Sequence, residues 1–357
     1  MRMIGLIGAA MLLGAASQLR SVENSTLTAV EGIKVGHFTL AGRPTGCTVI
    51  LAKDGTVGSV DVRGGAPGTR ETDLLNPVND VQMVNAIVLA GGSAFGLDAA
   101  SGTVKWLDEH HVGYPVGAAG VVPIVPSAVL IDLWFGGDPK IRPGPDCGYR
   151  AADAASTAAV VEGNVGAGAG ATVGKTGGLT ASGNAGPMKA GIGSAAIKLS
   201  NGLVVAAIVA VNAVGDVIDP VTGQVIAGVR GADGKLADAR TRVRADAGYA
   251  GRAGENTTIG VIATNARLTK VHAQKVAQMA HDGYARAISP IHMPADGDTV
   301  FSLATGAWTG EVSYGTIGAL AAEVMADAVV RAATQATASH GLPSARDLGT
   351  IPARLRQ

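Results

Sequence analysis

Short apolar runs that end in Gly, Asn or Asp alternate with alanine-rich stretches along most of this chain. A short continuous apolar run predicts a buried strand, and an amphipathic alanine-rich stretch predicts a helix. The strand-like runs lie at 86–90, 203–211, 257–266 and 298–305, and the helix-like stretches lie at 96–109, 269–288 and from about 316 onward. Without internal repeats or a separate linker, this alternation predicts a single α/β domain followed by a short tail.

Glycine is unusually frequent, at 52 of 357 residues against a usual share of ~7%. There is no Gly-X-Y period and 47% of the residues are hydrophobic, so the composition indicates a globular protein with many tight turns. The 28 basic and 28 acidic side chains leave no net charge, which argues against a nucleic-acid partner. Aromatic residues make up only 3%, too few for surfaces that stack bases or sugars.

The N-terminus has the pattern of a secretory signal, with an early Arg2, an apolar run from Met3 to about Ala16, and small residues before polar ones. The run is shorter than the ~20 apolar residues that a membrane span needs. We therefore predict a cleaved signal over residues 1–20 and an exported, periplasmic protein without a membrane-spanning segment. A disordered or buried apolar N-terminus is the alternative.

The two cysteines, Cys47 and Cys147, are 100 residues apart (147 − 47). In an exported protein they could form a disulfide, but this spacing gives no indication that they do. The seven histidines form no H-E-x-x-H pattern, and two cysteines cannot close a zinc site. We therefore expect no metal centre.

The stretch GNVGAGAGATVGKT, residues 163–176, looks like a phosphate-binding loop but fails on spacing. G-x-x-x-x-G-K-[ST] requires glycine at position 169, where the chain has Ala169. The same stretch fits G-x-G-x-x-A, but an alanine-rich, helix-like stretch precedes it where that fingerprint needs a strand. Nucleotide binding is therefore not indicated. Lys175 remains as an isolated cation, which could be an ordinary surface lysine.

A second near match lies at GGSAFG, residues 91–96, between a predicted strand and a predicted helix. A nucleophile elbow, G-x-S-x-G, needs glycine at position 95, where the chain has Phe95. A serine hydrolase using Ser93 remains possible, because Asp and His residues follow in a suitable order. The simpler interpretation is a turn at Gly92 and Ser93 whose backbone N–H groups line a substrate pocket.

Residues 230–256 are charged and lack apolar periodicity, which predicts a long exposed connection, and they end abruptly at an apolar strand. A threonine at such a boundary, here Thr257, can attack the carbonyl of the preceding Asn256 and become a free N-terminal residue after hydrolysis. Its own α-amino group then has a pKa of about 7.7–8.0 and can serve as the base. The alternatives are an ordinary β-branched strand start and an N-x-T glycosylation site at Asn256.

Two further positions could contribute to catalysis. Asn212 closes an apolar strand, where it is either a turn residue or an amide donor to a developing oxyanion. Asp296 and Asp298 flank a glycine, so both carboxylates could point the same way and separate each other's pKa values, which suits proton handling. An Asp-Gly turn or part of a cation site is the alternative for this pair.

Five segments together resemble the S58-type family of self-processing, N-terminal-nucleophile hydrolases: SVDVRGGAPGTRETDLL, AIVLAGGSAFGLDAA, VPIVPSAVLIDL, NTTIGVIATNA and HDGYARAISPIHMPADGDTVFSLATG. The family includes L-aminopeptidase D-amidase/esterases, β-peptidyl aminopeptidases and 6-aminohexanoate-oligomer endohydrolases. The resemblance runs in the same order from about Glu31 to Arg331. It implies a four-layer αββα sandwich, cleavage into an α chain (21–256) and a β chain (257–357), and a tetramer of these αβ units.

The resemblance also implies roles for single residues. Thr257 corresponds to the nucleophile, Asn212 to the oxyanion-hole asparagine, and Lys175 to an active-site lysine, and Asp296 and Asp298 correspond to the polar pair that orients the nucleophile.

This pattern does not match all members of the family equally. β-Peptidyl aminopeptidases have a serine nucleophile and a Ser/Glu pair, so Thr257 and the D-G-D motif are more similar to the oligomer endohydrolase. Ile131 replaces a tyrosine of that enzyme, which argues against the same activity.

We therefore predict a self-cleaving aminopeptidase or amidase that acts on small peptides or amino-acid amides without a metal or organic cofactor. Three other functions stay open: an acyltransferase similar to ornithine acetyltransferase, a nylon-oligomer-type endo-amidase, and a non-catalytic periplasmic binding protein. The sequence leaves the preference for L-, D- or β-amino acids open, because it depends on pocket walls such as residues 63–73.

Overall fold

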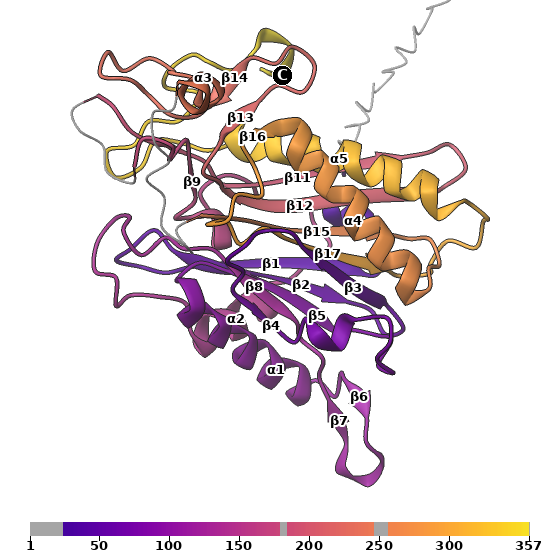
Figure 1. Cartoon of the computed structure of the whole chain (residues 1–357). Helices are drawn as coiled ribbons and strands as arrows, with labels where there is room; N and C mark the ends of the chain where they lie inside the picture. The colour runs from indigo at the N-terminus through magenta and orange to yellow at the C-terminus, as the bar shows by residue number, and fades with distance from the viewer. Residues whose placement is uncertain (1–23, 179–183, 246–255, 357) are drawn as a thin grey trace, which may run out of the picture.

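The computed structural model describes residues 24–178, 184–245 and 256–356, which form four layers: two helices, a sheet, a second sheet and two further helices (Figure 1). This arrangement confirms the predicted α/β class, and the order of the layers in Figure 1 agrees with an αββα sandwich. The predicted signal over residues 1–20 lies outside the described residues. Within them, no helix is long and apolar enough to cross a membrane.

The first sheet has the strand order β1-β2-β5-β8-β4. Its strands are β1 (Ile33–Thr39), β2 (Gly46–Ala52), β5 (Ala86–Ala90), β8 (Ser127–Val129) and β4 (Thr69–Arg70). Strand β5 is the apolar run predicted at 86–90, and all of its residues are buried. Helices α1 (Ala99–Glu109) and α2 (Pro145–Asp153) cover the outer face of this sheet (Figure 1).

The second sheet has the order β11-β12-β15-β17-β3. Its strands are β11 (Ile192–Lys198), β12 (Val204–Asn212), β15 (Thr257–Thr264), β17 (Thr299–Ala304) and β3 (Val57–Val62). The three apolar runs predicted in this part of the chain therefore lie side by side as β12, β15 and β17. Helices α4 (Lys270–Ala287) and α5 (Tyr314–Thr334) pack on its outer face, as the helix predictions expected (Figure 1).

Side chains alternate between the two faces of the second sheet. In β12 and β15, Ile208 and Val261 pack toward the first sheet, whereas Val209 and Ile262 pack toward α4 and α5. Because successive residues of a strand point to opposite faces, the ends of these strands can present side chains both to the space between the sheets and to the helix layer.

Smaller elements cluster at the end of the sandwich where β12 ends and β15 begins. Strands β13 (Asp216–Ile218), β14 (Val225–Ala227) and β16 (Ile288–Ser289) form a small sheet, and β9 (Thr172–Val173) pairs with β10 (Met188–Lys189). A short helix, α3 (Ala239–Arg244), contacts the turn before β14 through a hydrogen bond from Arg240 to Gly223 O. The hairpin of β6 (Tyr114–Pro115) and β7 (Val121–Val122) projects from the opposite end (Figure 1).

The prediction of an exposed connection over 230–256 is correct for most of residues 230–245, which are exposed or half-buried. Arg230 and Ala239 are the exceptions in this stretch and are buried. The buried carboxylate of Asp216 accepts hydrogen bonds from Val229 N at 2.8 Å and Ala239 N at 2.6 Å. These acceptors satisfy backbone donors that would otherwise need water, and so the segment folds back onto the protein. Residues 246–255 lie outside the described residues.

The C-terminal residues also pack more tightly than a tail. Ala345 is fully buried, the Thr350 hydroxyl donates to Ile226 O at 2.6 Å, and Arg354 forms an ion pair with Asp219. The segment after α5 therefore covers the small sheet, an interaction that sequence periodicity did not predict.

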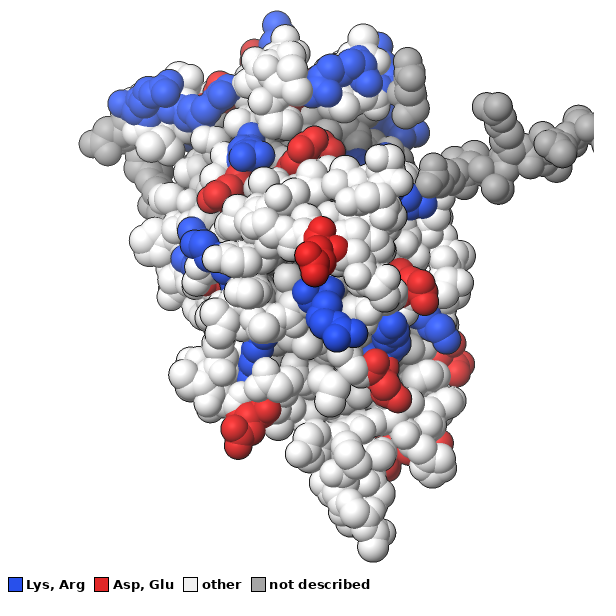
Figure 2. Space-filling model, turned by 90° about the vertical axis from the view of Figure 1, so that its right-hand side faces the viewer, with Lys and Arg blue, Asp and Glu red and all other residues white. Residues whose placement is uncertain are grey.

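A disulfide joins Cys47 of β2 to Cys147 of α2 and so links the first sheet to its helix layer. The sequence had left this pairing open. Charged side chains of both signs are interspersed over the face shown in Figure 2, with uncharged areas between them. That distribution agrees with the balanced charge of the sequence.

Candidate active site

Thr257 and Asn212 lie directly opposite each other, at the start of β15 and the end of β12. Directly opposed residues of an antiparallel pair point to the same face, with Cβ atoms about 5 Å apart. Both residues continue the series of positions that face the first sheet, and both are buried. Strand pairing therefore brings the predicted nucleophile and the predicted oxyanion donor together between the two sheets.

The side-chain oxygen of Asn212 accepts several hydrogen bonds. Lys175 Nζ donates to Oδ1 at 2.8 Å and to the backbone oxygen of Asn212 at 2.9 Å. Thr172 adds its backbone N at 3.1 Å and its hydroxyl at 3.3 Å. The amide nitrogen Nδ2 donates in turn to Ile131 O, at 3.0 Å. Donors on one side and an acceptor on the other fix the orientation of the amide, and within the described residues the second Nδ2–H donates to no protein acceptor.

Lys175 reaches this position at the end of the glycine-rich stretch. The alanine-rich segment before it is helical only as far as Asp153, so the predicted continuation of that helix is wrong. A 3-10 turn at Gly166–Gly168 leads into β9, and no helix opens at the loop. Gly174 has φ of +77° and lies so close to Val229 N that a Cβ would be 2.0 Å from it. The glycines therefore allow close backbone approach, and the loop lacks the helix N-terminus that phosphate binding uses.

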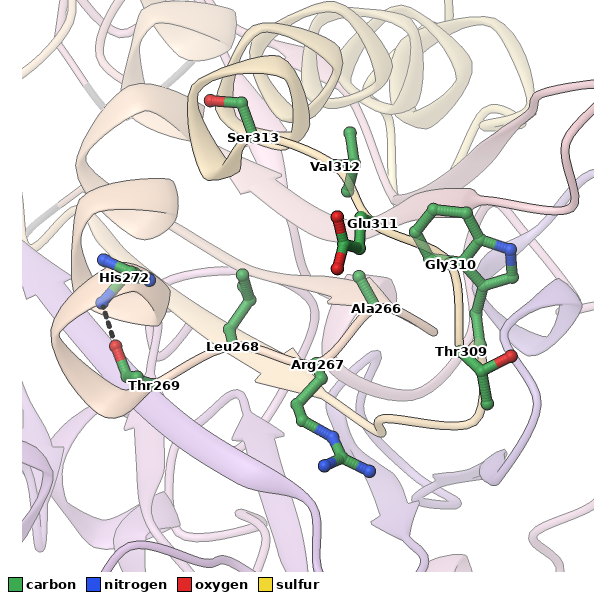
Figure 3. A pocket seen from close by; sticks show the side chains of 11 residues that line it. Ala266, Arg267, Leu268, Thr269, His272, Thr309, Gly310, Glu311, Val312 and Ser313 are labelled. Carbon is green, nitrogen blue, oxygen red and sulfur yellow. Dashed lines mark hydrogen bonds between the residues drawn. The ribbon is translucent and has the colours of Figure 1, made fainter.

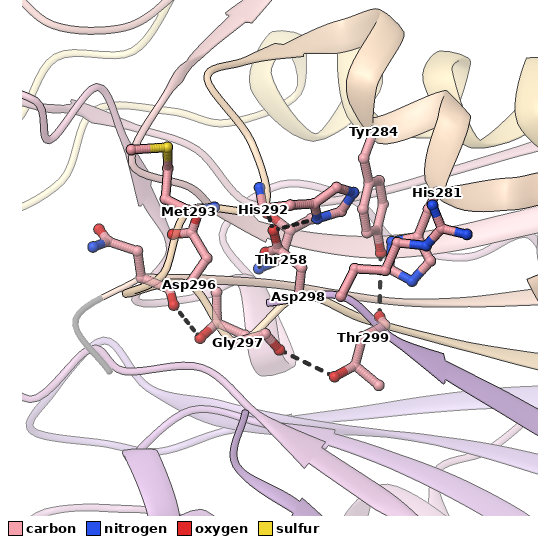
Figure 4. A network of polar contacts seen from close by, with 12 residues as sticks. Thr258, His281, Tyr284, His292, Met293, Asp296, Gly297, Asp298 and Thr299 are labelled. Carbon is pink, nitrogen blue, oxygen red and sulfur yellow. Dashed lines mark hydrogen bonds and ion pairs between the residues drawn. The ribbon is translucent and has the colours of Figure 1, made fainter. Parts of the chain in front are cut away.

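Asp298 holds the start of β15 from the helix side of the sheet. Its Oδ1 accepts from Thr258 N at 2.7 Å, and its Oδ2 accepts from His292 N at 3.0 Å and contacts His292 Nδ1 at 2.9 Å (Figure 4). Thr258 follows the predicted nucleophile directly, so this carboxylate fixes the backbone beside Thr257.

Asp296 has a different environment. Its Oδ2 accepts from Met293 N at 2.9 Å, while the buried Oδ1 has no hydrogen-bond partner within the described residues. Burial, followed by the nearby charge of Asp298, raises the pKa of Asp296 to about 7, against lowering contributions that include Lys175 and His292. The D-G-D motif thus contains a carboxyl group whose raised pKa would suit proton exchange near neutral pH, with burial as the main cause and the neighbouring carboxylate as the second.

The carbonyl oxygen of Asn256, directly before Thr257, accepts two hydrogen bonds. Thr257 Oγ1 donates to Asn256 O, and Gly297 N donates to the same oxygen at 3.0 Å. Gly297 lies so close that a Cβ on it would be 2.8 Å from Thr257 Oγ1. Only 1% of Asn256 and 3% of Thr257 is exposed. In the uncut chain, the hydroxyl therefore lies against its own preceding peptide bond and away from solvent.

Sequence reasoning missed a cluster of aromatic and imidazole side chains behind the D-G-D motif. His292 contacts Asp298, and the rings of His281 and Tyr284 lie 4.8 Å and 6.2 Å from the His292 ring, between centroids (Figure 4). Burial lowers the pKa of His281 to about 4, and burial and Asp298 raise the pKa of Tyr284 well above its usual value. The only available signal was the position of His292 four residues before Asp296.

The nucleophile-elbow hypothesis gains no support from the geometry. No histidine in the described part of the chain forms a hydrogen bond with Ser93. Gly92 N instead donates to Asp132 Oδ1 at 3.0 Å, and Asp132 forms a buried ion pair with Arg43 at 2.8 Å. Asp132 follows Ile131, whose carbonyl accepts from Asn212. The turn at Gly92 and Ser93 is therefore connected to the site through the backbone at 131–132. Ser93 N donates to Leu130 O at 2.9 Å, so both N–H groups that were expected to line a substrate pocket are bound within the protein.

A large surface pocket, of about 990 Å³, lies elsewhere (Figure 3). It is formed by the connections that follow β15 and β17, with Arg267, Thr309 and Glu311 among its lining residues. It contains none of the predicted site residues. Within the described residues, no group of three or more His, Cys, Asp or Glu side chains could hold a metal ion.

The sequence model of peptidase family S58 matches residues 25–346. The chain belongs to peptidase family S58. This membership confirms the predicted resemblance. Among S58 relatives, an uncharacterised aminopeptidase of Mycobacterium tuberculosis (strain H37Rv) is 43% identical and covers 91% of this chain and 98% of its own length. A 6-aminohexanoate-oligomer endohydrolase of Kocuria sp. is 32% identical and covers 85% of this chain and 84% of its own length.

Solved structures confirm the fold of this S58 member. A β-aminopeptidase of Burkholderia sp. has a TM-score of 0.66 at 20% identity, covering 94% of this chain and 95% of its own. An L-aminopeptidase D-Ala-esterase/amidase of Ochrobactrum anthropi, described as a variant of the Ntn hydrolase fold, also has a TM-score of 0.66, at 18% identity and 90% and 88% coverage. Family and fold together confirm the predicted enzyme class, a hydrolase of the aminopeptidase/amidase type.

Proposed function

We propose that this S58 hydrolase cleaves itself between Asn256 and Thr257 and then hydrolyses amides with Thr257 as an N-terminal nucleophile. The observation that carries the proposal is the contact of Thr257 Oγ1 with Asn256 O, an oxygen that Gly297 N also binds at 3.0 Å. A hydroxyl against its own carbonyl, at the first residue of a central strand, is placed to attack that carbonyl. The N–H of Gly297 stabilises the oxyanion that the attack creates.

Self-cleavage proceeds through an ester. Thr257 Oγ attacks the carbonyl carbon of Asn256 while its proton is transferred to a base, and the C–N bond breaks as the Thr257 nitrogen takes up a proton. Water then hydrolyses the ester, which leaves a new carboxylate on Asn256 and a free amine and hydroxyl on Thr257. Asp296, a neighbour of Asn256 with a carboxyl pKa of about 7, is the group in this site suited to accept and return the proton.

The same atoms then act on a substrate. Thr257 Oγ attacks a substrate amide, the α-amino group of Thr257 takes its proton, and the leaving amine departs with that proton. Water completes the reaction by hydrolysing the acyl-enzyme. Asn212 Nδ2 donates to the tetrahedral oxyanion, an interaction worth on the order of 3 kcal/mol in other hydrolases. Lys175 adds a positive charge beside this amide and favours the neutral form of the Thr257 amine.

We infer small peptides or amino-acid amides as substrates, because relatives of this chain are named as aminopeptidases. An endo-amidase is the second candidate, supported by the relatives named 6-aminohexanoate-oligomer endohydrolase. Ile131 contacts the site through its backbone carbonyl, which accepts a hydrogen bond from Asn212. Its side chain lacks the hydroxyl group that the tyrosine of the oligomer endohydrolase would supply. That difference favours the aminopeptidase.

The first test is a denaturing gel of the purified protein. Cleavage yields a 101-residue fragment (357 − 256) with Thr257 at its N-terminus. The Thr257→Ala variant stays uncut and inactive, whereas Thr257→Ser retains a hydroxyl and is cut. A stable uncut wild-type chain, or a Thr257→Ala chain that still splits at this bond, contradicts the proposal.

Activity is then measured on p-nitroanilides of L-, D- and β-amino acids and on amidated peptides. A labelled amine acceptor separates hydrolysis from acyl transfer, because a transferase forms a labelled amide instead of the free acid. Export to the periplasm and assembly into tetramers of cleaved αβ units remain predictions. N-terminal sequencing of the large fragment and light scattering of the native protein test them.

A further inference from the structure

We propose that Lys189, a buried residue outside the predicted site, is a positioning residue for the oxyanion donor Asn212. It anchors the loop whose donors orient the Asn212 amide. The inference rests on the proposed function, in which Asn212 stabilises the oxyanion.

Lys189 lies in β10 and is fully buried. Its Nζ donates to three backbone carbonyls, those of Gly168 at 3.0 Å, Ala171 at 2.9 Å, and Ala190. An ammonium group has three N–H donors, so the three carbonyls provide one acceptor for each donor. Burial disfavours a charged group, and it lowers the pKa of Lys189 to about 7 against the opposing effect of the Asp132 charge. A methionine or leucine would fill such a position without that cost, and so the lysine requires a reason.

The two carbonyls from the glycine-rich loop supply that reason. Gly168 and Ala171 belong to the turn that leads into β9, and Lys189 pairs with Thr172 across β9 and β10. Thr172 is the next residue after Ala171, and its N and Oγ1 both donate to Asn212 Oδ1. Lys189 thus fixes the backbone one residue before the donors that hold the Asn212 amide.

The same loop delivers Lys175 three residues later, and Lys175 Nζ donates to Asn212 Oδ1 at 2.8 Å. Every donor to Asn212 Oδ1 among the described residues therefore comes from a segment that Lys189 anchors. If this segment shifts, the amide can rotate and its free N–H no longer points at the oxyanion. Displacements of about 1 Å in a preorganised site can lower a rate by about 100-fold.

The chain contains a matched control. Lys270, at the start of α4, is also buried, and its Nζ also donates to three backbone carbonyls, those of Leu74 at 2.8 Å, Asn79 at 3.0 Å and Val81 at 2.8 Å. Lys270 lies beyond the C-terminal end of β15, whereas Thr257 is at the N-terminal end of that strand. Lys189→Met and Lys270→Met therefore remove the same number and kind of hydrogen bonds, but only Lys189→Met removes them next to the site.

The experiment is a double-mutant cycle with Asn212→Ala. The kcat and KM values are measured on alanine p-nitroanilide, in the L-, D- or β-form that the wild type hydrolyses fastest, per mole of cleaved protein. We expect Lys189→Met to lower kcat at least about tenfold with KM within about twofold, because the oxyanion forms only in the transition state. On the Asn212→Ala background the same change lowers kcat less than about twofold. Lys270→Met changes kcat less than about twofold on either background.

The melting temperatures separate positioning from a structural role, because both lysine variants lower the melting temperature but only one lowers kcat. If Lys189→Met yields no cleaved protein, Lys189→Gln takes its place in the cycle, since its amide keeps two donors. An equal loss of kcat on both backgrounds, or no loss at all, overturns the role of Lys189. If Asn212→Ala by itself leaves kcat unchanged, it is the oxyanion assignment in the proposed function that fails.

Discussion

Asn212 and Thr257 face each other across β12 and β15, although 45 residues separate them in the chain (257 − 212). The antiparallel backbone register sets this proximity, so it does not depend on either side chain. Because Asn212 also accepts hydrogen bonds from buried donors, the stability of each variant is measured beside its activity.

Replacing Asn212 by Ala removes the amide N–H that we assign to the oxyanion. We expect kcat to fall by about 10²–10³-fold, the loss seen when one such donor is removed from other hydrolases. Steady-state kinetics on cleaved protein measure it, with Asn201→Ala in an exposed loop as the control. A variant with wild-type kcat would exclude Asn212 as a donor.

Gly297→Ala is expected to block self-cleavage. A Cβ at this position would lie 2.8 Å from both Thr257 Oγ1 and Ala66 O, so the hydroxyl or the loop has to move. The Gly144→Ala variant is the control, because Gly144 has negative φ and a Cβ there meets no atom within 4 Å. The amount of 101-residue fragment is followed over time on a denaturing gel. Normal cleavage in the Gly297 variant would show that this contact does not position the nucleophile.

We expect the Asp296 carboxyl group to lower the stability of the uncut protein as the pH rises. The pKa of its carboxyl group is raised from 3.8 to about 7, so between these values the folded protein holds a proton that the unfolded chain has released. The free energy of unfolding then falls with increasing pH over this window. Asp216, with a pKa raised to about 6, acts in the same direction, whereas His281, with a pKa lowered to about 4, acts in the opposite direction below pH 6.5.

Asp296→Asn in a Thr257→Ala background isolates this contribution. We expect the free energy of unfolding at pH 8 minus that at pH 5, measured by urea unfolding, to be more positive in the Asn variant, because the other titrating groups remain the same. The Thr257→Ala background keeps the chain uncut throughout the titration. Equal pH dependence in the two proteins would mean that Asp296 titrates normally.

The disulfide between Cys47 and Cys147 closes a long loop and joins β2 to α2. In the chain-entropy model, a link across about 100 residues contributes roughly 4–5 kcal/mol to stability. Replacing both cysteines by Ala is therefore expected to lower the free energy of unfolding by several kcal/mol with little effect on kcat, since the link lies away from Thr257. Thiol counting by mass spectrometry checks the bond, and two free thiols in protein from the periplasm would disprove it.

The sequence was sufficient to predict β5, β12, β15 and β17, because these strands are largely apolar and fully buried. The other strands were not predicted, including β2 and β8, which lie inside the first sheet. Strand β3 carries Ser59 and Asp61, and α3 depends on the distant carboxylate of Asp216, which no local pattern reveals. The packed C-terminal segment was missed for the same reason.

The candidate site was also predictable from the sequence only in part. The strand boundary at Thr257 and the D-G-D motif were visible as local patterns. The contact of Lys175 with Asn212 joins positions 37 residues apart and depends on the path of the glycine loop, so only the family resemblance suggested it. His292 and Lys189 carry no sequence pattern of their own, and their roles follow from side-chain contacts.

The order of strands in the second sheet means that both fragments of the cleaved protein would contribute strands to one sheet. Strands β15 and β17 lie between β12 on one side and β3 on the other, so the smaller fragment would be enclosed by strands of the larger one. Each fragment alone would expose bare strand edges, which favour aggregation. Once denatured, the cut enzyme has to reassemble from two molecules, so its recovery should fall on dilution. The uncut Thr257→Ala chain refolds as a single molecule and should recover independently of concentration.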